Sequence, residues 1–179
     1  MNGRIGAGAA ALALVAALAF PARAAADAAY AFVNVYSGRC LDAAAGQLGS
    51  NGTRVQLWDC YGDGQFNQRW YVEPLGMDGT SARYQIINKA SGRCLDATAE
   101  WGGVDGTPVQ LWDCYGAGQT NQLWYWKAEL GGVYLQNVAY GRVLDATWQW
   151  GGANGTPVQL WDNYGPGQTN QRWDGFPTG

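Results

Sequence analysis

One pattern recurs three times along this chain of 179 residues, and it constrains the fold more than any other feature. Each copy carries an Asp, a first Trp 16 positions later and a second Trp 12 positions after that. In the first copy these residues are Asp42, Trp58 and Trp70. A period of about 50 residues indicates one supersecondary unit repeated around a shared core. We place the copies at about residues 30–78, 79–130 and 131–179.

Each copy contains short apolar runs that are rich in Val, Leu, Tyr and Trp and bounded by Gly, Asn, Asp and Ser, a pattern typical of strands. No segment after the N-terminal region has helical periodicity. A propeller uses about four or more blades, so three copies of four strands favour a single closed all-β barrel with pseudo-threefold symmetry. In the second copy we predict strands near Tyr84–Asn88, Cys94–Asp96, Val109–Trp112 and Leu123–Lys127.

The alternation of side chains along a strand separates the core from the outer surface. In the first copy we expect Leu41, Val55 and Leu57 to lie in the core. The residues of opposite parity then face outward as one patch that combines a carboxylate, an amide and a large aromatic ring. These residues are Cys40, Asp42, Gln56, Trp58 and Cys60.

Each copy closes on the segment Asn-Gln-x-Trp. By the same alternation, Gln68 and Trp70 share one face and Asn67 points the other way. We expect the closing tryptophans to be core residues. They are Trp70, Trp124 and Trp173.

The four cysteines follow the same register. Cys40 and Cys60 are 20 positions apart, and so are Cys94 and Cys114. The third copy loses both positions together, which favours disulfides within copies over the other two connectivities. Free thiols and a metal site are the alternatives, but a four-cysteine zinc site usually has pairs separated by about two to four residues, and no such pair occurs.

The N-terminus is predicted to be a cleaved signal peptide, residues 1–24, with the domain at 25–179. Arg4 precedes the uncharged run Ile5–Phe20, and Ala22-Arg23-Ala24 resembles a cleavage site, although cleavage as late as Ala28 is also compatible. The run is shorter than the roughly 20 residues that a transmembrane anchor needs. We therefore expect a secreted protein in an oxidising environment, where disulfides persist.

Composition excludes several function classes. The chain has no histidine, which removes the commonest general base and metal ligand. Without the two arginines of the signal peptide, nine basic and 14 acidic residues remain, a net of about −5. This charge argues against nucleic acid and anionic membrane surfaces as partners. We expect no cofactor, no metal, no membrane insertion and a monomer.

The outward patch has the chemistry of a sugar site. A pyranose can lie on an indole face while a carboxylate and amides bind its hydroxyls, which is the general pattern of a few fixed polar groups beside an aromatic wall. The alternative is that the aromatic residues only complete the barrel and the Asp caps a turn.

The repeated Cys-Leu-Asp, Val-Gln-Leu-Trp-Asp-Cys and Asn-Gln-x-Trp segments resemble the ricin B-type lectins, also called R-type lectins or family 13 carbohydrate-binding modules. The resemblance covers about residues 30 to 175 and implies a β-trefoil with sugar sites named α, β and γ. It implies that the Asp and the Asn bind hydroxyls, that the Trp stacks on the sugar, and that the two Gln assist or support the site. In some relatives the residue at the position of the Tyr also contacts the sugar. These residues are Asp42, Gln56, Trp58, Tyr61, Asn67 and Gln68 in the first copy, Asp96, Gln110, Trp112, Tyr115, Asn121 and Gln122 in the second, and Asp145, Gln159, Trp161, Tyr164, Asn170 and Gln171 in the third.

The sequence departs from the family pattern in two places. The third copy has Val143 and Asn163 where the others have cysteines, so we expect its site to be looser. The last two copies add Trp101, Trp148 and Trp150 after the Asp. These tryptophans either extend the β and γ sites into subsites or cover the side of the barrel.

We therefore expect a secreted, non-catalytic lectin with up to three weak sugar sites for a galactose-, xylan- or arabinose-type glycan. A β-trefoil inhibitor that binds proteins is one alternative, but it would not need the same polar set in every copy. A glycoside hydrolase is the other. It needs two carboxylates about 5 to 9.5 Å apart, whereas the repeated acids Asp42 and Asp59 have opposite strand parity.

Overall fold

The computed structural model describes residues 28–178, and the predicted signal peptide lies outside this range. Within it the chain forms twelve strands and no α-helix, with four strands in each repeat. The strands are β1 (Ala29–Asn34), β2 (Cys40–Ala43), β3 (Thr53–Trp58), β4 (Trp70–Asp78), β5 (Ser81–Asn88), β6 (Cys94–Ala97), β7 (Val109–Trp112), β8 (Leu123–Glu129), β9 (Gly132–Asn137), β10 (Val143–Ala146), β11 (Val158–Trp161) and β12 (Trp173–Thr178). The four strands predicted in the second copy are all present, and β5, β6 and β8 extend beyond the predicted ends.

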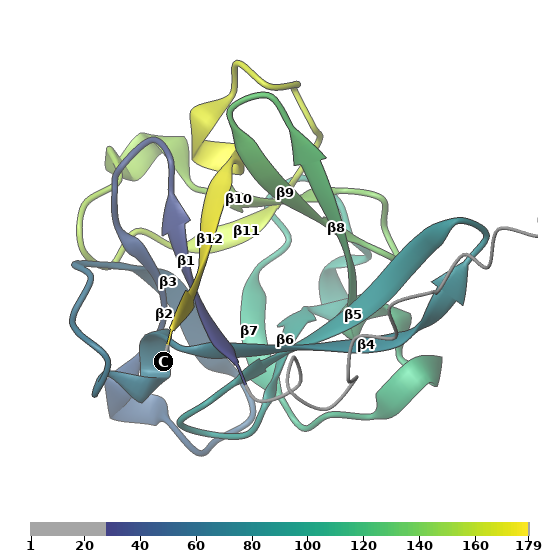
Figure 1. The fold of residues 1–179 in the computed structure, drawn as a ribbon, viewed down its shortest axis with the longest axis horizontal. Coiled ribbons are helices and arrows are strands. Elements are labelled where there is room, and N and C mark those ends of the chain that lie inside the picture. Colours follow the sequence, from purple (N-terminus) through teal and green to yellow (C-terminus); the bar gives the residue numbers. More distant parts are fainter. Residues whose placement is uncertain (1–27, 179) are drawn as a thin grey trace, which may run out of the picture.

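The first and last strand of each repeat form a closed barrel. Antiparallel pairing runs from β1 to β4, β5, β8, β9, β12 and back to β1, so that no strand edge of this ring is left open. Figure 1 shows β1 beside β12, and the hairpins β8–β9 and β4–β5 that join successive repeats. Closure removes the unpaired edges that make open sheets prone to aggregation.

The other six strands form three hairpins, one per repeat, and the hairpins have the same register. Asp42 lies opposite Gln56 in β2–β3, and the equivalent Asp and Gln face each other in β6–β7 and β10–β11. The hairpins also contact one another through the β3–β7 pairing and two isolated bridges. A six-stranded barrel with three such hairpins is a β-trefoil, so the predicted fold is confirmed.

The barrel core contains the residues that alternation predicted. Leu41, Val55 and Leu57 are fully buried, and so are the three closing tryptophans. Each indole N–H donates to the carbonyl oxygen of the Leu that precedes the Asp of its repeat, over 3.0 to 3.2 Å. The large rings therefore fill the core with their one polar atom satisfied.

Two sets of polar contacts join each repeat to the next. Three buried Asn side chains each donate to the backbone carbonyl of the Asn in an Asn-Gln-x-Trp segment of the neighbouring repeat, over 2.9 to 3.0 Å. The pairs are Asn34 with Asn170, Asn88 with Asn67, and Asn137 with Asn121. Near the surface, Arg39 pairs with Asp59 at 3.0 Å and also donates to Asn154 of the third repeat at 2.8 Å. Because both sets recur around the threefold axis, each repeat is positioned by its neighbour.

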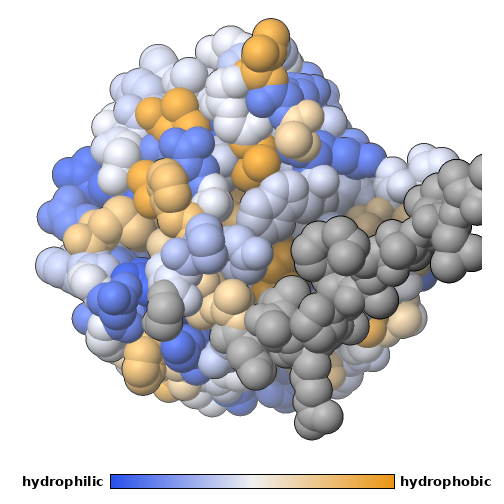
Figure 2. Space-filling model, in the orientation of Figure 1, coloured by the Kyte–Doolittle hydropathy of each residue, from blue (hydrophilic) through white to orange (hydrophobic). Residues whose placement is uncertain are grey.

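On the part of the surface that is uncovered in Figure 2, the hydrophobic residues lie in separate small groups among hydrophilic ones. Scattered apolar residues of this kind are normal on a water-exposed surface.

Candidate functional site

Each repeat has an open hollow beside its hairpin, and we call these hollows site α, site β and site γ in chain order. Their volumes are about 360, 240 and 180 Å³. Five of the six residues predicted for each site line the hollow. They are Asp42, Gln56, Trp58, Tyr61 and Asn67 in site α, Asp96, Gln110, Trp112, Tyr115 and Asn121 in site β, and Asp145, Gln159, Trp161, Tyr164 and Asn170 in site γ.

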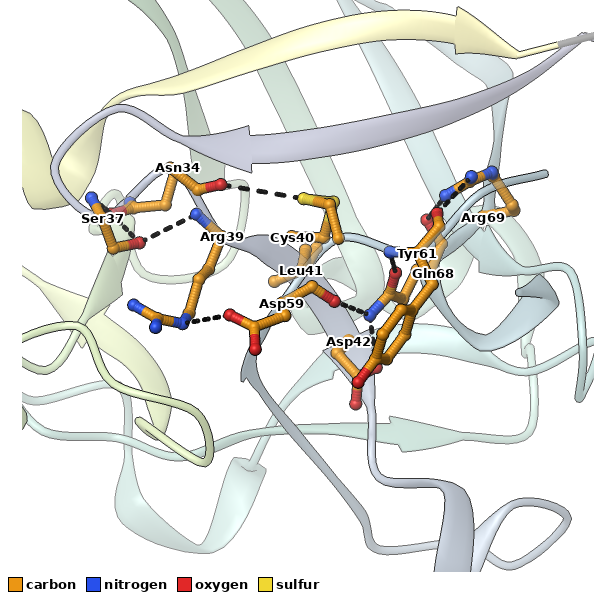
Figure 3. Close-up of a disulfide and its surroundings, with 12 residues drawn as sticks. Asn34, Ser37, Arg39, Cys40, Leu41, Asp42, Asp59, Tyr61, Gln68 and Arg69 are labelled. Carbon is orange, nitrogen blue, oxygen red and sulfur yellow. Dashed lines mark hydrogen bonds and ion pairs between the residues drawn. A yellow bond between two sulfur atoms is a disulfide. The ribbon is translucent and has the colours of Figure 1, made fainter. Parts of the chain in front are cut away.

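A carboxylate accepts three hydrogen bonds at the base of site α. Gln56 donates to Asp42 Oδ1 at 3.0 Å, while Asn67 and Gln68 donate to Oδ2 at 2.8 and 3.0 Å. Figure 3 shows the Gln68 amide pointing toward both Asp42 and Asp59. Since a carboxylate can accept about four hydrogen bonds, one position on Oδ1 remains for a ligand hydroxyl.

The same network occurs in the other two repeats. Asp96 accepts bonds from Gln110, Asn121 and Gln122 at 3.1, 2.9 and 3.0 Å. Asp145 accepts bonds of 3.0, 2.8 and 3.0 Å from the equivalent residues Gln159, Asn170 and Gln171. The near-identical distances follow from the identical spacing of these residues in sequence.

The expectation that Asn67 and Gln68 point in opposite directions is wrong. These residues lie in the 3-10 helix η2 (Phe66–Gln68) and not in a strand, so both side chains reach Asp42. The equivalents in the other repeats are η5 (Thr120–Gln122) and η7 (Thr169–Gln171). The period-two alternation of a strand does not apply to a turn of 3-10 helix.

The Gln of each Asn-Gln-x-Trp segment lies beneath its hollow and supports the site. Gln68, Gln122 and Gln171 are fully buried and do not line the hollows. In site α, Gln68 also donates to the carbonyl of Asp59 and accepts from the backbone N–H of Tyr61, both at 2.9 Å. It therefore fixes the loop that carries Tyr61.

The outward-facing patch is also more buried than alternation predicted. Cys40, Asp42 and Gln56 share one side of the hairpin as expected, but they are only 2%, 4% and 5% exposed. The reason is that η2 packs against β2, where Asn67 bonds the carbonyl of Ala43 at 2.9 Å. The outer side of the hairpin is therefore covered around these three residues, whereas Trp58 is partly exposed and Cys60 is exposed.

Burial changes the acidity of the three site carboxylates. Desolvation raises the pKa of Asp42, Asp96 and Asp145 above the ordinary value of 3.8, and the amide hydrogen bonds oppose this shift. The charge of Asp105 raises the pKa of Asp145 further. Because desolvation disfavours the charged form, each carboxylate gains free energy from any further hydrogen bond that a ligand supplies.

The wall of each hollow is aromatic. The Trp is partly exposed, and the Tyr beside it is 51%, 60% and 64% exposed in sites α, β and γ. In site γ the Trp161 indole N–H donates to the Tyr164 hydroxyl at 3.2 Å, which holds the two rings side by side. An exposed indole face next to fixed carboxylate and amide groups is suited to a ring with one apolar face and polar edges.

Sequence reasoning missed a Gln in every site. Gln65, Gln119 and Gln168 line the hollows, and each donates at 2.8 Å to the Oδ1 of the site Asn two positions later. The signal was present, because the spacing Gln-x-Asn is the same in all three copies. It also missed rim residues that differ between sites, namely Arg54 in site α, Glu100 in site β and Gln149 in site γ.

The three additional tryptophans do not behave alike. Trp148 lines site γ, whereas Trp101 and Trp150 line none of the three hollows, although all three are more than half exposed. Trp148 also packs against Tyr36 of the first repeat, with ring centroids 4.7 Å apart. The structure therefore places one candidate subsite residue at site γ and none at site β.

The predicted disulfides are present. Cys40–Cys60 and Cys94–Cys114 have Cα–Cα distances of 5.1 and 5.2 Å, and the described residues include no free cysteine. In the third repeat Val143 is buried, and Asn163 accepts a 3.2 Å hydrogen bond from Arg172. That repeat replaces a covalent link with apolar packing and a polar contact.

Neither a metal centre nor a spanning helix is found in residues 28–178. No three acidic, Cys or His side chains there are arranged to hold a metal ion. No helix in that range has the length and apolar character needed to cross a bilayer.

Solved structures with the same fold include a designed threefold-symmetric protein, ThreeFoil, which is 27% identical, with a TM-score of 0.71, and is matched over 82% of this chain and 96% of that chain. An exo-β-1,3-galactanase from Clostridium thermocellum is 26% identical, with a TM-score of 0.72, over 85% of this chain and 30% of that one. The C-terminal half of an earthworm R-type lectin, in complex with GalNAc, is 18% identical, with a TM-score of 0.58, over 84% of this chain and 99% of that chain. No curated protein sequence matches significantly.

The ricin-type β-trefoil lectin domain family matches residues 28–173, which is most of the chain. This match, the closed threefold barrel and the repeated site agree with one another. The chain belongs to the ricin-type β-trefoil lectin domain family.

Proposed function

We propose that this protein is a secreted, non-catalytic lectin that binds a glycan or polysaccharide at up to three sites, one in each repeat. The observation that carries the proposal is the threefold recurrence of a hydrogen-bonded Asp beside a partly exposed Trp and an exposed Tyr. A fold alone would require the core residues to recur, but it would not require an open hollow with the same polar groups each time.

Several observations support the finer parts of this proposal. Two disulfides suit an oxidising, extracellular setting. Galactose-type glycans are a reasonable first probe because one similar structure is an exo-β-1,3-galactanase, and xylan- and arabinose-type glycans follow.

The structure favours sugar binding over hydrolysis of a glycosidic bond. It requires a pair of carboxylates on either side of the scissile bond, and among the described residues only one acidic side chain lines site α and one lines site γ. Asp59 lies outside site α and pairs with Arg39. Site β has Glu100 in addition to Asp96, so release of reducing sugar by Glu100→Gln and unaltered protein is the comparison to make, and we expect none from either.

Weak single sites would combine through multivalency. A shallow polar site gains little free energy after desolvation and ordering are included. Three sites on one rigid barrel can raise the avidity for a repetitive polysaccharide by roughly 10²-fold or more if one ligand reaches two of them.

The test removes the stacking ring from every site at once. We expect the triple variant Trp58→Ala, Trp112→Ala, Trp161→Ala to lose retention on insoluble polysaccharide and sugar binding by calorimetry. The matched control is Trp101→Ala with Trp150→Ala, which removes exposed indoles that line no hollow. Undiminished sugar binding by a folded triple variant would refute the proposal.

A further inference from the structure

The rim of site α carries a positive charge that the other two sites lack. Arg54 lines the hollow, and its guanidinium donates to Gln56 Oε1 at 2.7 Å. The equivalent positions in the Thr-x-Val segment of the other repeats are Pro108 and Pro157. Gln56 is itself bonded to Asp42, so the guanidinium is held next to the group that is expected to bind sugar hydroxyls.

This charge is available to a ligand. Arg54 is exposed, and no carboxylate within residues 28–178 lies within 4.0 Å of its guanidinium. By contrast, Arg39, Arg93 and Arg142 each pair with an Asp near the surface. A guanidinium has five N–H donors in a planar fork that matches a carboxylate, and the contact with Gln56 leaves most of them free.

Site β has the opposite charge at its rim. There Glu100 lines the hollow and is exposed, and it occupies the position of Gly46 in site α and of Gln149 in site γ. Besides the Asp that every site has, a carboxylated ligand would meet a cation at the rim of site α, an anion at the rim of site β and a neutral rim at site γ. Charges placed in this way select between ligands by repulsion as well as by attraction.

We propose that site α selects an acidic sugar, namely a uronic acid unit of a polysaccharide. Arg54 binds the carboxylate of the uronic acid, while Trp58 stacks on its ring and Asp42 accepts its hydroxyls. This inference rests on the proposed function, because it assigns a ligand class to one of the three sugar sites. A charge-assisted and potentially bidentate contact accounts for the selectivity.

The test isolates site α with the double variant Trp112→Ala, Trp161→Ala, and isolates site β with Trp58→Ala, Trp161→Ala. The probes are galactose against galacturonic acid, and xylo-oligosaccharides with and without a glucuronic acid branch, titrated by calorimetry. We expect the α-only protein to bind the acidic member of each pair roughly ten-fold tighter, and the β-only protein to prefer the neutral member. The preference of the α-only protein should fall at high salt.

Replacing the arginine separates this inference from the proposed function. We expect Arg54→Gln and Arg54→Pro, the second of which copies the other repeats, to reduce the ratio of acidic to neutral affinity to about one. If the α-only protein binds galactose but shows no acidic preference, or if Arg54→Gln keeps that preference, the inference is overturned while the proposed function stands. If the α-only protein binds neither member of any pair, sugar binding at site α fails and the inference fails with it.

Discussion

Introducing the missing disulfide into the third repeat should stabilise the protein. The geometry is already present, because Val143 lies opposite Trp161 in the β10–β11 hairpin, as Cys40 lies opposite Trp58 in β2–β3. The two existing bridges span 20 positions each, and Val143 and Asn163 are separated by the same number. The double variant Val143→Cys, Asn163→Cys therefore places two thiols where the fold already accepts a bridge in the other repeats.

The expected gain is the difference between two terms. Closing a loop of about 20 residues is worth about 3 kcal/mol on the chain-entropy model. The variant loses the two hydrogen bonds that Asn163 Oδ1 accepts, from Arg172 and from the backbone N–H of Gly165, which together cost about 2 kcal/mol. The net gain of about 1 kcal/mol in the free energy of unfolding corresponds to a rise in Tm of roughly 2 to 4 °C for a domain of this size.

Thermal unfolding followed by circular dichroism measures this gain, with non-reducing mass spectrometry to verify the bridge. The matched control is Val143→Ser, Asn163→Ser, which has side chains of similar size to Cys and cannot form a bridge. It should melt below the unaltered protein, because a hydroxyl then takes the place of the fully buried Val143 side chain. A variant with the bridge formed and an unchanged or lower Tm would show that the third hairpin does not share the geometry of the other two.

Three further predictions concern the sites. Asp96→Ala removes the acceptor of three amide donors, so we expect a loss of about 2 to 4 kcal/mol in stability by urea unfolding and no sugar binding at site β; full stability would contradict the network. Because burial raises the pKa of the site carboxylates above 3.8, each carboxylate takes up its proton at a pH above 3.8 on acidification. Sugar affinity, measured by titration across a pH series, should therefore decline before the pH falls to 3.8. Constant affinity down to pH 3.8 would refute this reasoning. Trp148→Ala should weaken oligosaccharide binding in a γ-only protein and Trp150→Ala should not, since only Trp148 lines site γ; equal effects of the two changes on calorimetric affinity would contradict the assignment.

The identical spacing of the three copies was sufficient to predict most of the fold. Because Asp42 and Gln56 are as far apart as Asp96 and Gln110, the hairpins that contain them must share one register, and the structure has that register. The same spacing identified the disulfide partners and the core tryptophans. These features depend on strand alternation and on hairpin length, which are local properties that a sequence carries directly.

Only the tertiary structure decided how the site is assembled. Alternation placed Asn67 and Gln68 on opposite faces, yet both bond Asp42, because η2 packs as a 3-10 turn against β2 and covers the outer side of the hairpin. The contact between Arg54 and Gln56 likewise became apparent only from the positions of the side chains. The sequence shows only that Arg54 stands where the other two repeats have proline. Packing between elements determines which side chains converge on one atom and which keep a free charge, and no local periodicity encodes that outcome.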